Sequence, residues 1–377
     1  MPNAIAFFPW ISTDSELVVN DIRLLPYERG RKPGDQAGAS QKNIDAILAA
    51  YANRKDEPIE DATLLEAGDC RFGSEFDARF DDLFRVRDLI AFAALAERRL
   101  FRGHFDYTNT HCYVLVVQSY DPNHLGNFTF TTRRRDGHTA NTWATDDFAF
   151  YRPLHVDRHA RLKIDLPLLA ALQFSDQDER LPHDAIAEFN AANTDSPDIP
   201  IHTEVVMTKS AFEFLFGIGN RVEDFVDALF TVVPAQKIEP ELEGPLKKTW
   251  LERRRTDRLL EAWAREFCDL RGSAAHGKDR GGARFVWSPY SHLAFTSLLF
   301  PLLLKQRLAT DGFLQLKERD AIELEMIEAY LTHEPMARPT EEARHEHPWE
   351  RIYSEGVLGM MMHRHLKREL SDLWDDQ

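Results

Sequence analysis

The feature that most constrains this chain is a change in the spacing of its apolar residues near position 200. Before it, short apolar stretches such as residues 4–10 alternate with turn residues, a pattern that predicts β-strands. After about residue 203, apolar residues recur three and four positions apart, which predicts amphipathic helices. A chain of 377 residues is long enough for two domains. We therefore expect an α+β protein, with a mixed β/α domain at residues 1–200 and an all-α helical bundle at residues 201–377.

Individual elements follow from the same patterns. In the first half we expect strands at residues 4–10, 16–27, 110–119 and 128–132, and helices at residues 44–52 and 76–101. In the second half a helix at residues 205–216 ends at Gly217, and Asn220 with Glu223 forms a capping box for the next helix. A further helix extends from about residue 245 to residue 271. Ser288 and Pro289 begin another as its N-cap and first helical residue.

Hydropathy and cysteine usage indicate the compartment. The longest apolar run, residues 293–304, is 12 residues long and includes Pro301, whereas a bilayer span needs about 20. No basic segment precedes the short apolar run near the N-terminus, so we expect no secretory signal. The three cysteines, Cys70, Cys112 and Cys268, lack the spacing of metal ligands and fit a reducing environment. We expect a cytoplasmic protein that uses neither a membrane span nor a cofactor or metal.

The distribution of charge singles out one segment. The net charge of −16 argues against a surface that is coated along its whole length by nucleic acid. Residues 247–284, however, contain eleven Lys or Arg and six Asp or Glu, a local balance of +5. We expect this segment to contact RNA phosphates, with Arg265, Lys278 and Arg280 as binding residues.

The same segment contains an arginine and a histidine five residues apart, Arg271 and His276. A guanidinium clasps phosphate oxygens and an imidazole transfers protons near neutral pH, so this pair suits phosphodiester chemistry. Two other Arg/His pairs have this spacing, but only this one follows an amphipathic helix and precedes a basic, glycine-rich loop. Five helical residues turn through about 140°, so the two side chains meet only around a helix end or across a two-fold axis. A homodimer is therefore expected.

Three stretches resemble the HEPN domains of the ApeA-like group. Residues 268–277 read Cys-Asp-Leu-Arg-Gly-Ser-Ala-Ala-His-Gly, similar to the signature aromatic-Asp-x-Arg-Ser-x-x-x-His-Gly. Residues 211–215, Ala-Phe-Glu-Phe-Leu, resemble the Ala-x-Glu-x-Leu stretch of that group's first helix, and residues 189–193 resemble its Asn-rich segment. The resemblance covers about residues 185–310. Cys268 stands where a tyrosine is usual, and Gly272 where a serine or another polar residue commonly follows the arginine.

The resemblance implies a helical HEPN dimer that acts as a metal-independent endoribonuclease. It implies that His276 is the general acid or base and that Arg271 stabilises the charged phosphorane. The products implied are a 2′,3′-cyclic phosphate and a 5′-hydroxyl, because the 2′-hydroxyl of the RNA is the nucleophile. It also implies a regulated RNase of anti-phage defence, in which the N-terminal domain senses a trigger or restrains the nuclease.

Two further residues are candidate supporting groups, each with a structural interpretation beside the functional one. Glu213, on an otherwise apolar helix, either orients the Arg/His pair or is an acid with a structural role. Ser273 either hydrogen-bonds the substrate or bonds back to the helix backbone.

Two other functions remain open on the sequence alone. The first is a non-catalytic HEPN-like dimer that binds RNA, a nucleotide or a protein. The second is a metallohydrolase built on clustered histidines, although no HExxH or zinc-finger spacing is present. Those clusters are His155/Asp157/His159, His104/Asp106/His111, His345/His347 and His363/His365.

Overall fold

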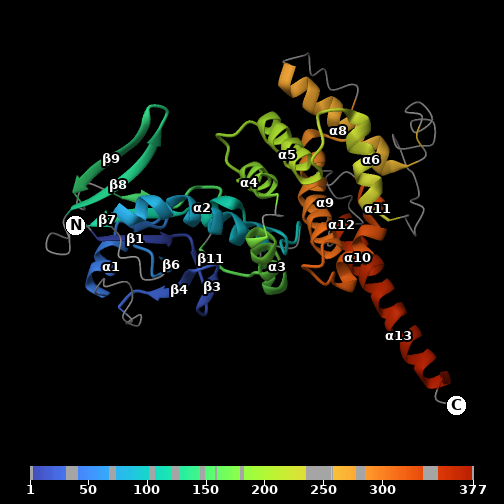
Figure 1. Cartoon of the computed structure of the whole chain (residues 1–377), viewed down its shortest axis with the longest axis horizontal. Coiled ribbons are helices and arrows are strands. Elements are labelled where there is room, and N and C mark those ends of the chain that lie inside the picture. The colour runs from blue at the N-terminus through green and yellow to red at the C-terminus, as the bar shows by residue number, and fades with distance from the viewer. Residues whose placement is uncertain are drawn as a thin grey trace. The chain divides into compact units, whose positions relative to one another are not determined.

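The structure is a computed structural model of the whole chain (Figure 1). It describes residues 3–30, 41–67, 74–101, 107–120, 127–144, 149–157, 159–178, 182–234, 256, 258–276, 285–333 and 347–375. Within them a β-sheet region at the N-terminus is followed by a mostly helical region. The α+β class expected from the apolar spacing is confirmed.

The chain forms two compact units, each assembled from more than one segment. The first contains residues 1–98, 108–169 and 194–197, and the second contains residues 99–107, 170–193 and 198–377. The segment at residues 170–193 therefore belongs to the helical unit, although it precedes the expected boundary. The division into domains at residues 1–200 and 201–377 stays a prediction.

The first unit is built on a seven-stranded antiparallel sheet. Its strand order is β3-β4-β6-β1-β7-β8-β9. The strands are β1 (Asn3–Phe8), β3 (Leu17–Val19), β4 (Ile22–Glu28), β6 (Asp61–Ala67), β7 (Val116–Tyr120), β8 (Asn127–Arg134) and β9 (Gly137–Ala144).

The central strands are held by apolar side chains with charges at exposed positions. In β4, Ile22, Leu24 and Tyr27 are buried. The exposed Arg23 forms ion pairs with Glu16 and with Glu66 of β6. The single strand expected at residues 16–27 is in fact two, β3 and β4. The chain turns between them at Asn20, whose φ of 55° lies in the left-handed region that asparagine tolerates.

Shorter elements complete this unit: β2 (Ile11–Ser12), α1 (Gln41–Leu48), β5 (Tyr51–Ala52), α2 (Ser74–Leu95), η1 (Thr110–Tyr113), β10 (Phe150–Tyr151) and β11 (Ala160–Arg161). β10 pairs in parallel with β5, and β11 with β2. The helix expected at residues 44–52 ends at Leu48, and the chain then enters β5. The strand expected at residues 110–119 begins instead with the 3₁₀ turn η1. These short apolar runs satisfy either geometry, so local spacing alone did not separate them.

The helical unit begins with α3 (Leu166–Gln177), α4 (His183–Ala192), α5 (Ile201–Phe216), α6 (Val222–Val232) and α8 (Leu259–His276). Helix α5 ends where the sequence predicted, because Gly217 adopts a left-handed φ of 65° and its N–H donates to the Glu213 carbonyl. The capping box expected at Asn220 is not formed. The N-cap of α6 is Arg221, which makes no side-chain capping hydrogen bond.

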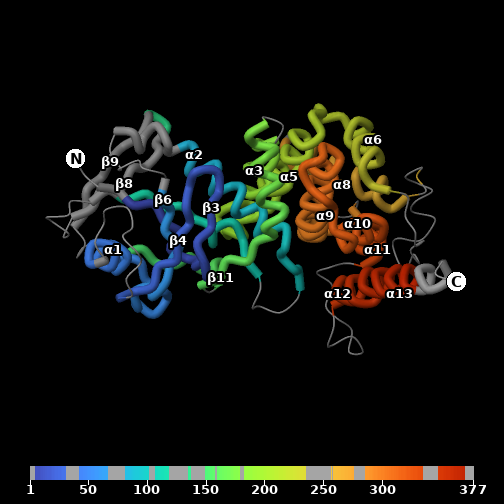
Figure 2. Tube along the Cα trace, turned by 60° about the horizontal axis from the view of Figure 1, so that its bottom comes forward, coloured from blue at the N-terminus to red at the C-terminus, as the bar shows by residue number. Residues whose placement is uncertain are grey.

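The last part of this unit comprises α9 (Pro289–Thr310), α10 (Glu318–Glu325), α11 (Ile327–Tyr330), α12 (Pro348–Arg351) and α13 (Leu358–Asp375). A π-helical turn, η5 (Ile352–Val357), joins α12 to α13, so that residues 348–375 form one continuous helical segment (Figure 2). No helix in the described parts of the chain has the length and apolarity that crossing a bilayer requires.

The core of the helical unit is aromatic and lies between α5, α6, α8 and α9. Phe212 of α5 contacts Phe225, Phe267 and Phe300, with ring centroids 5.3–6.4 Å apart. Trp263 of α8 stacks on Phe267 at 5.2 Å and meets Phe295 of α9 edge-on at 4.7 Å. Such offset and T-shaped pairs add specific geometry to apolar burial. Together they fix the position of α8.

The start of α9 provides a test of local capping. Ser288 Oγ accepts a hydrogen bond from the Ser291 N–H at 3.1 Å, and Pro289 is the first helical residue, as the sequence predicted. We expect Ser288→Ala to lower the free energy of unfolding by about 1 kcal/mol, because the N–H loses its partner. Urea denaturation measures this loss.

Ser210→Ala is the matched control, since the Ser210 hydroxyl bonds the Val206 carbonyl inside α5 and caps no helix end. Equal destabilisation by both substitutions would contradict the capping interpretation.

Candidate functional site

Helix α8 carries both residues of the predicted catalytic pair. It continues past Arg271 through His276, its last residue, whereas the sequence predicted an end near residue 271. Their helical positions are therefore about 140° apart around the axis of α8. One copy of α8 does not present both residues on the same face. The His276 side chain is outside the described part of the structure.

Arg271 differs from the other arginines of the helical unit. Ten of them lie among the described residues, and nine have a guanidinium nitrogen 3.9 Å or less from a carboxylate oxygen: Arg99, Arg221, Arg258, Arg265, Arg307, Arg319, Arg351, Arg364 and Arg368. Arg271 has no such partner within the described residues. Its side chain is half-buried, and its Nε is buried without a hydrogen-bond partner there.

Glu213, a predicted supporting residue, is engaged by a lysine. Lys209 Nζ lies 2.9 Å from Glu213 Oε1, one turn away on α5. The lysine is only 1% exposed, and its ammonium lies 4.5 Å from the centre of the Phe225 ring. The sequence analysis missed Lys209. The one available signal was a lysine at an interior position of an otherwise apolar helix.

Cys268 lies next to these charges. Its thiol is buried, and burial raises its pKa to about 11. Lys209, Glu213 and Arg271 each act electrostatically on this thiol, as does Asp269. Lys209 and Glu213 of α5 and Arg271 of α8 therefore act on the same buried thiol. The link between Glu213 and Arg271 is this shared thiol, at the contact of α5 with α8 through Phe212 and Phe267.

Buried acids attach α8 to its surroundings at two points. Glu266, fully buried, accepts hydrogen bonds from the backbone N–H groups of Val286 and Trp287 at 2.8 Å each, and its Oε1 lies 3.4 Å from Nε2 of the buried His292. Glu328 accepts from the Leu259 N–H at 3.1 Å and pairs with Arg258 at 3.1 Å. Sequence periodicity gave no sign of either contact, because both join segments that are distant in the chain.

The other predicted site residues have different surroundings. Arg265, expected to bind RNA, pairs with Glu261 at 3.0 Å and Glu223 at 3.6 Å. The Ser273 side chain is partly buried, and no described residue hydrogen-bonds to it, including the helix backbone. Lys278 and Arg280 lie outside the described residues. RNA binding by these residues and by Ser273 stays a prediction.

The histidine clusters are the candidate metal ligands of the sequence. In the first unit His111 Nδ1 lies 2.5 Å from His155 Nε2, and His159 Nε2 lies 3.0 Å from Asp61 Oδ1. No group of three or more His, Cys, Asp or Glu side chains suited to a metal ion is present among the residues that the structure describes. His104, Asp106 and His345 are outside them.

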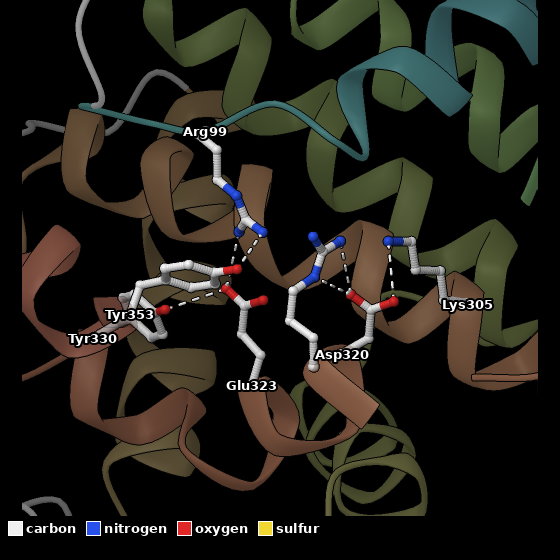
Figure 3. A network of polar contacts seen from close by, with 7 residues as sticks. Arg99, Lys305, Asp320, Glu323, Tyr330 and Tyr353 are labelled. Carbon is white, nitrogen blue, oxygen red and sulfur yellow. Dashed lines mark hydrogen bonds and ion pairs between the residues drawn. The ribbon is translucent and has the colours of Figure 1, made fainter. Parts of the chain in front are cut away.

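A second polar network in the helical unit ties the segment after α2 to the C-terminal helices (Figure 3). Arg99 donates to the Tyr353 hydroxyl at 2.8 Å and lies 3.9 Å from Glu323 Oε1, which also accepts from the Tyr330 hydroxyl at 3.2 Å. Burial raises the pKa of the Glu323 carboxyl, and Arg99 opposes this rise. Beside it Lys305 and Asp320 form a buried pair at 3.3 Å. Because its groups are engaged with one another, we interpret this network as structural.

Comparison with protein family models, with curated proteins and with solved structures finds no match to this chain. The HEPN resemblance therefore depends on the motif residues themselves.

The burial of Cys268 predicts that its thiol reacts slowly in the native protein. With its pKa raised to about 11, the thiol is protonated at pH 8, and its burial also blocks access. We expect iodoacetamide to alkylate Cys268 at least tenfold more slowly in the native protein than in urea, where an ordinary cysteine has a pKa of about 8.5. Mass spectrometry of the peptide containing Cys268 measures both rates. Equal rates in the two states would show that the thiol is exposed and is not part of the core.

Proposed function

We propose that this protein is a metal-independent endoribonuclease in which Arg271 and His276 act on the scissile phosphate. The observation that supports this most directly is the state of Arg271. In a chain of net charge −16, it is the one described arginine of the helical unit without a carboxylate partner. An unpaired, partly buried guanidinium is a ready partner for the oxygens of an anionic ligand.

The proposed reaction uses a nucleophile that belongs to the RNA. His276 accepts the proton of the 2′-hydroxyl as that oxygen attacks the phosphorus, or donates a proton to the departing 5′-oxygen. Arg271 stabilises the negative charge that develops on the phosphorane. The P–O5′ bond breaks as the P–O2′ bond forms, which leaves a 2′,3′-cyclic phosphate and a 5′-hydroxyl. No metal is needed in this scheme.

The helix geometry favours a homodimer for this chemistry. Because Arg271 and His276 are about 140° apart on one helix, two copies of α8 facing each other supply the two groups to one phosphate. RNA as substrate and the homodimer are parts of the proposal.

Substitution of the pair tests the proposed function. We expect His276→Ala and Arg271→Ala each to lower the rate of RNA cleavage by about 10²–10³-fold, the usual loss for a positioned proton-transfer group or charge-stabilising donor. Wild-type cleavage persists in EDTA, and the fragments end in 2′,3′-cyclic phosphate. Gel electrophoresis of end-labelled RNA with mass analysis of the termini measures both.

Two substitutions serve as controls: His363→Ala and Arg221→Ala remove a histidine and an arginine from exposed positions of the same unit. Cleavage that survives His276→Ala, or that EDTA abolishes, overturns the proposal. If wild type binds RNA without any product, and Arg271→Ala lowers the affinity, the protein is instead the non-catalytic RNA-binding module.

A further inference from the structure

The lysine beside Glu213 is unusual for three reasons. Lys209 is buried to 99%, and an ammonium is costly to remove from water unless it is paired. It precedes its acid by four residues, which is the less favourable order for a helical ion pair. An apolar side chain of similar size would pack there without a charge to compensate. The stability of α5 therefore does not account for a lysine at this position.

The surroundings of Lys209 compensate its charge. Its ammonium contacts the Glu213 carboxylate at 2.9 Å and the face of the Phe225 ring at 4.5 Å. Phe225 in turn contacts Trp263 of α8, with ring centroids 6.4 Å apart. The ammonium is thus held in place against the aromatic core that positions α8.

The same region contains the unpaired guanidinium. Helices α5 and α8 meet through Phe212 and Phe267, whose centroids are 6.4 Å apart. The residues that follow these two rings include Glu213 on α5 and Cys268 and Arg271 on α8, and the last two are three residues apart on one face. Lys209, Glu213 and Arg271 all act electrostatically on the Cys268 thiol: the two cations lower its pKa and Glu213 raises it. Asp269 also acts on this thiol but is only two positions from Arg271, which places it on a different face of α8.

Two cations, Lys209 and Arg271, therefore act on the same thiol as the Glu213 carboxylate, where α5 packs against α8, and Lys209 is the one bound to that acid. We propose that Lys209 is a positioning residue: by holding the Glu213 carboxylate, it prevents this acid from pairing with Arg271 and leaves the guanidinium for a phosphate. This role rests on the proposed function, in which Arg271 contacts the scissile phosphate. In this proposal Glu213 competes with the phosphate for Arg271, and Lys209 prevents that competition.

The reactivity of Arg271 tests the role of Lys209 without any RNA. Phenylglyoxal modifies a guanidinium more slowly when a carboxylate pairs with it, and mass spectrometry reads the modification of each arginine. In Lys209→Met, which keeps an unbranched apolar chain, Glu213 is released, and we expect Arg271 to react about tenfold more slowly than in wild type, as for a charge-assisted hydrogen bond. In Glu213→Gln, and in the double variant K209M/E213Q, the Arg271 rate stays at the wild-type value.

RNA cleavage is the second readout. We expect KM to rise about tenfold in Lys209→Met with kcat little changed, because Glu213 then competes with the substrate for Arg271. In K209M/E213Q the KM returns to the wild-type value. Glu213→Gln leaves a buried lysine unpaired and lowers stability, but per folded molecule it keeps the wild-type KM.

Lys305→Met is the matched control. Lys305 is also 1% exposed and also pairs with a buried acid, Asp320 at 3.3 Å. In Lys305→Met we expect the Arg271 modification rate and KM to remain unchanged. Thermal unfolding of each variant confirms that the folded fraction is the same in the assays.

Three results would overturn the proposal. They are an unchanged Arg271 rate in Lys209→Met, equal KM losses in the two single variants, and no recovery of KM or rate in the folded double variant. The failure of the proposed function gives a different pattern: wild type does not cleave RNA, while the phenylglyoxal rates still report whether Lys209 restrains Glu213.

Discussion

The contact of Phe212 with Phe267 is the interaction on which the helical unit depends. It joins α5 to α8, and the same Phe212 ring also meets Phe225 and Phe300 on two further helices. Since packed interiors leave few voids, α8 cannot rotate about its axis without disturbing all of these rings. Buried acids then fix α8 along its length, with Glu328 at its first turn and Glu266 near its middle. The position of Arg271, one turn beyond Phe267, is therefore set by the aromatic core.

The second constraint is the distribution of charge in an acidic chain. Counted along the sequence, residues 247–284 have a local balance of +5, which favours contact with phosphate. In the structure, Arg258 and Arg265 of this segment are each neutralised by glutamates, among them Glu328 and Glu223, which lie outside it. Within the described part of this segment the unpaired positive charge is therefore smaller than the sequence count, and Arg271 is the one described arginine there without a carboxylate partner. Such a guanidinium suits the contact with a single phosphate that we propose.

How much the sequence predicts depends on how local the physical cause is. The end of α5 at Gly217 and the start of α9 at Ser288 depend only on nearby residues, and both predictions are confirmed. The break at Asn20 was missed because a strand and a tight hairpin share the same apolar spacing. The capping box at Asn220 was wrong because the N-cap of α6 is one residue later, at Arg221.

The candidate site shows the same division. Arg271 and His276 were predicted as site residues because their residue types and their sequence context suit phosphodiester chemistry, and Glu213 because it stands on an otherwise apolar helix. Lys209 was missed because its burial results from contacts with Phe225 on another helix, which no local pattern records. The pairing of Arg265 with Glu223 was missed for the same reason. Residue types indicate which reactions a site suits, whereas the partner of each charged side chain depends on tertiary packing.

The competition of Glu213 with the phosphate for Arg271 also bears on the homodimer that we propose. For Arg271 and His276 of one chain to contact the same phosphate, both side chains would have to lie on the same face of α8. The buried Cys268 is close to Arg271 along that face. On a continuous helix they are about 140° apart, so each helix offers an arginine on one flank and a histidine near its end. A two-fold axis places the histidine position of one helix near the arginine of the other without bending either. In such an arrangement the arginine has to stay free of acids in its own chain until the phosphate arrives, and an acid held by a buried lysine meets that condition.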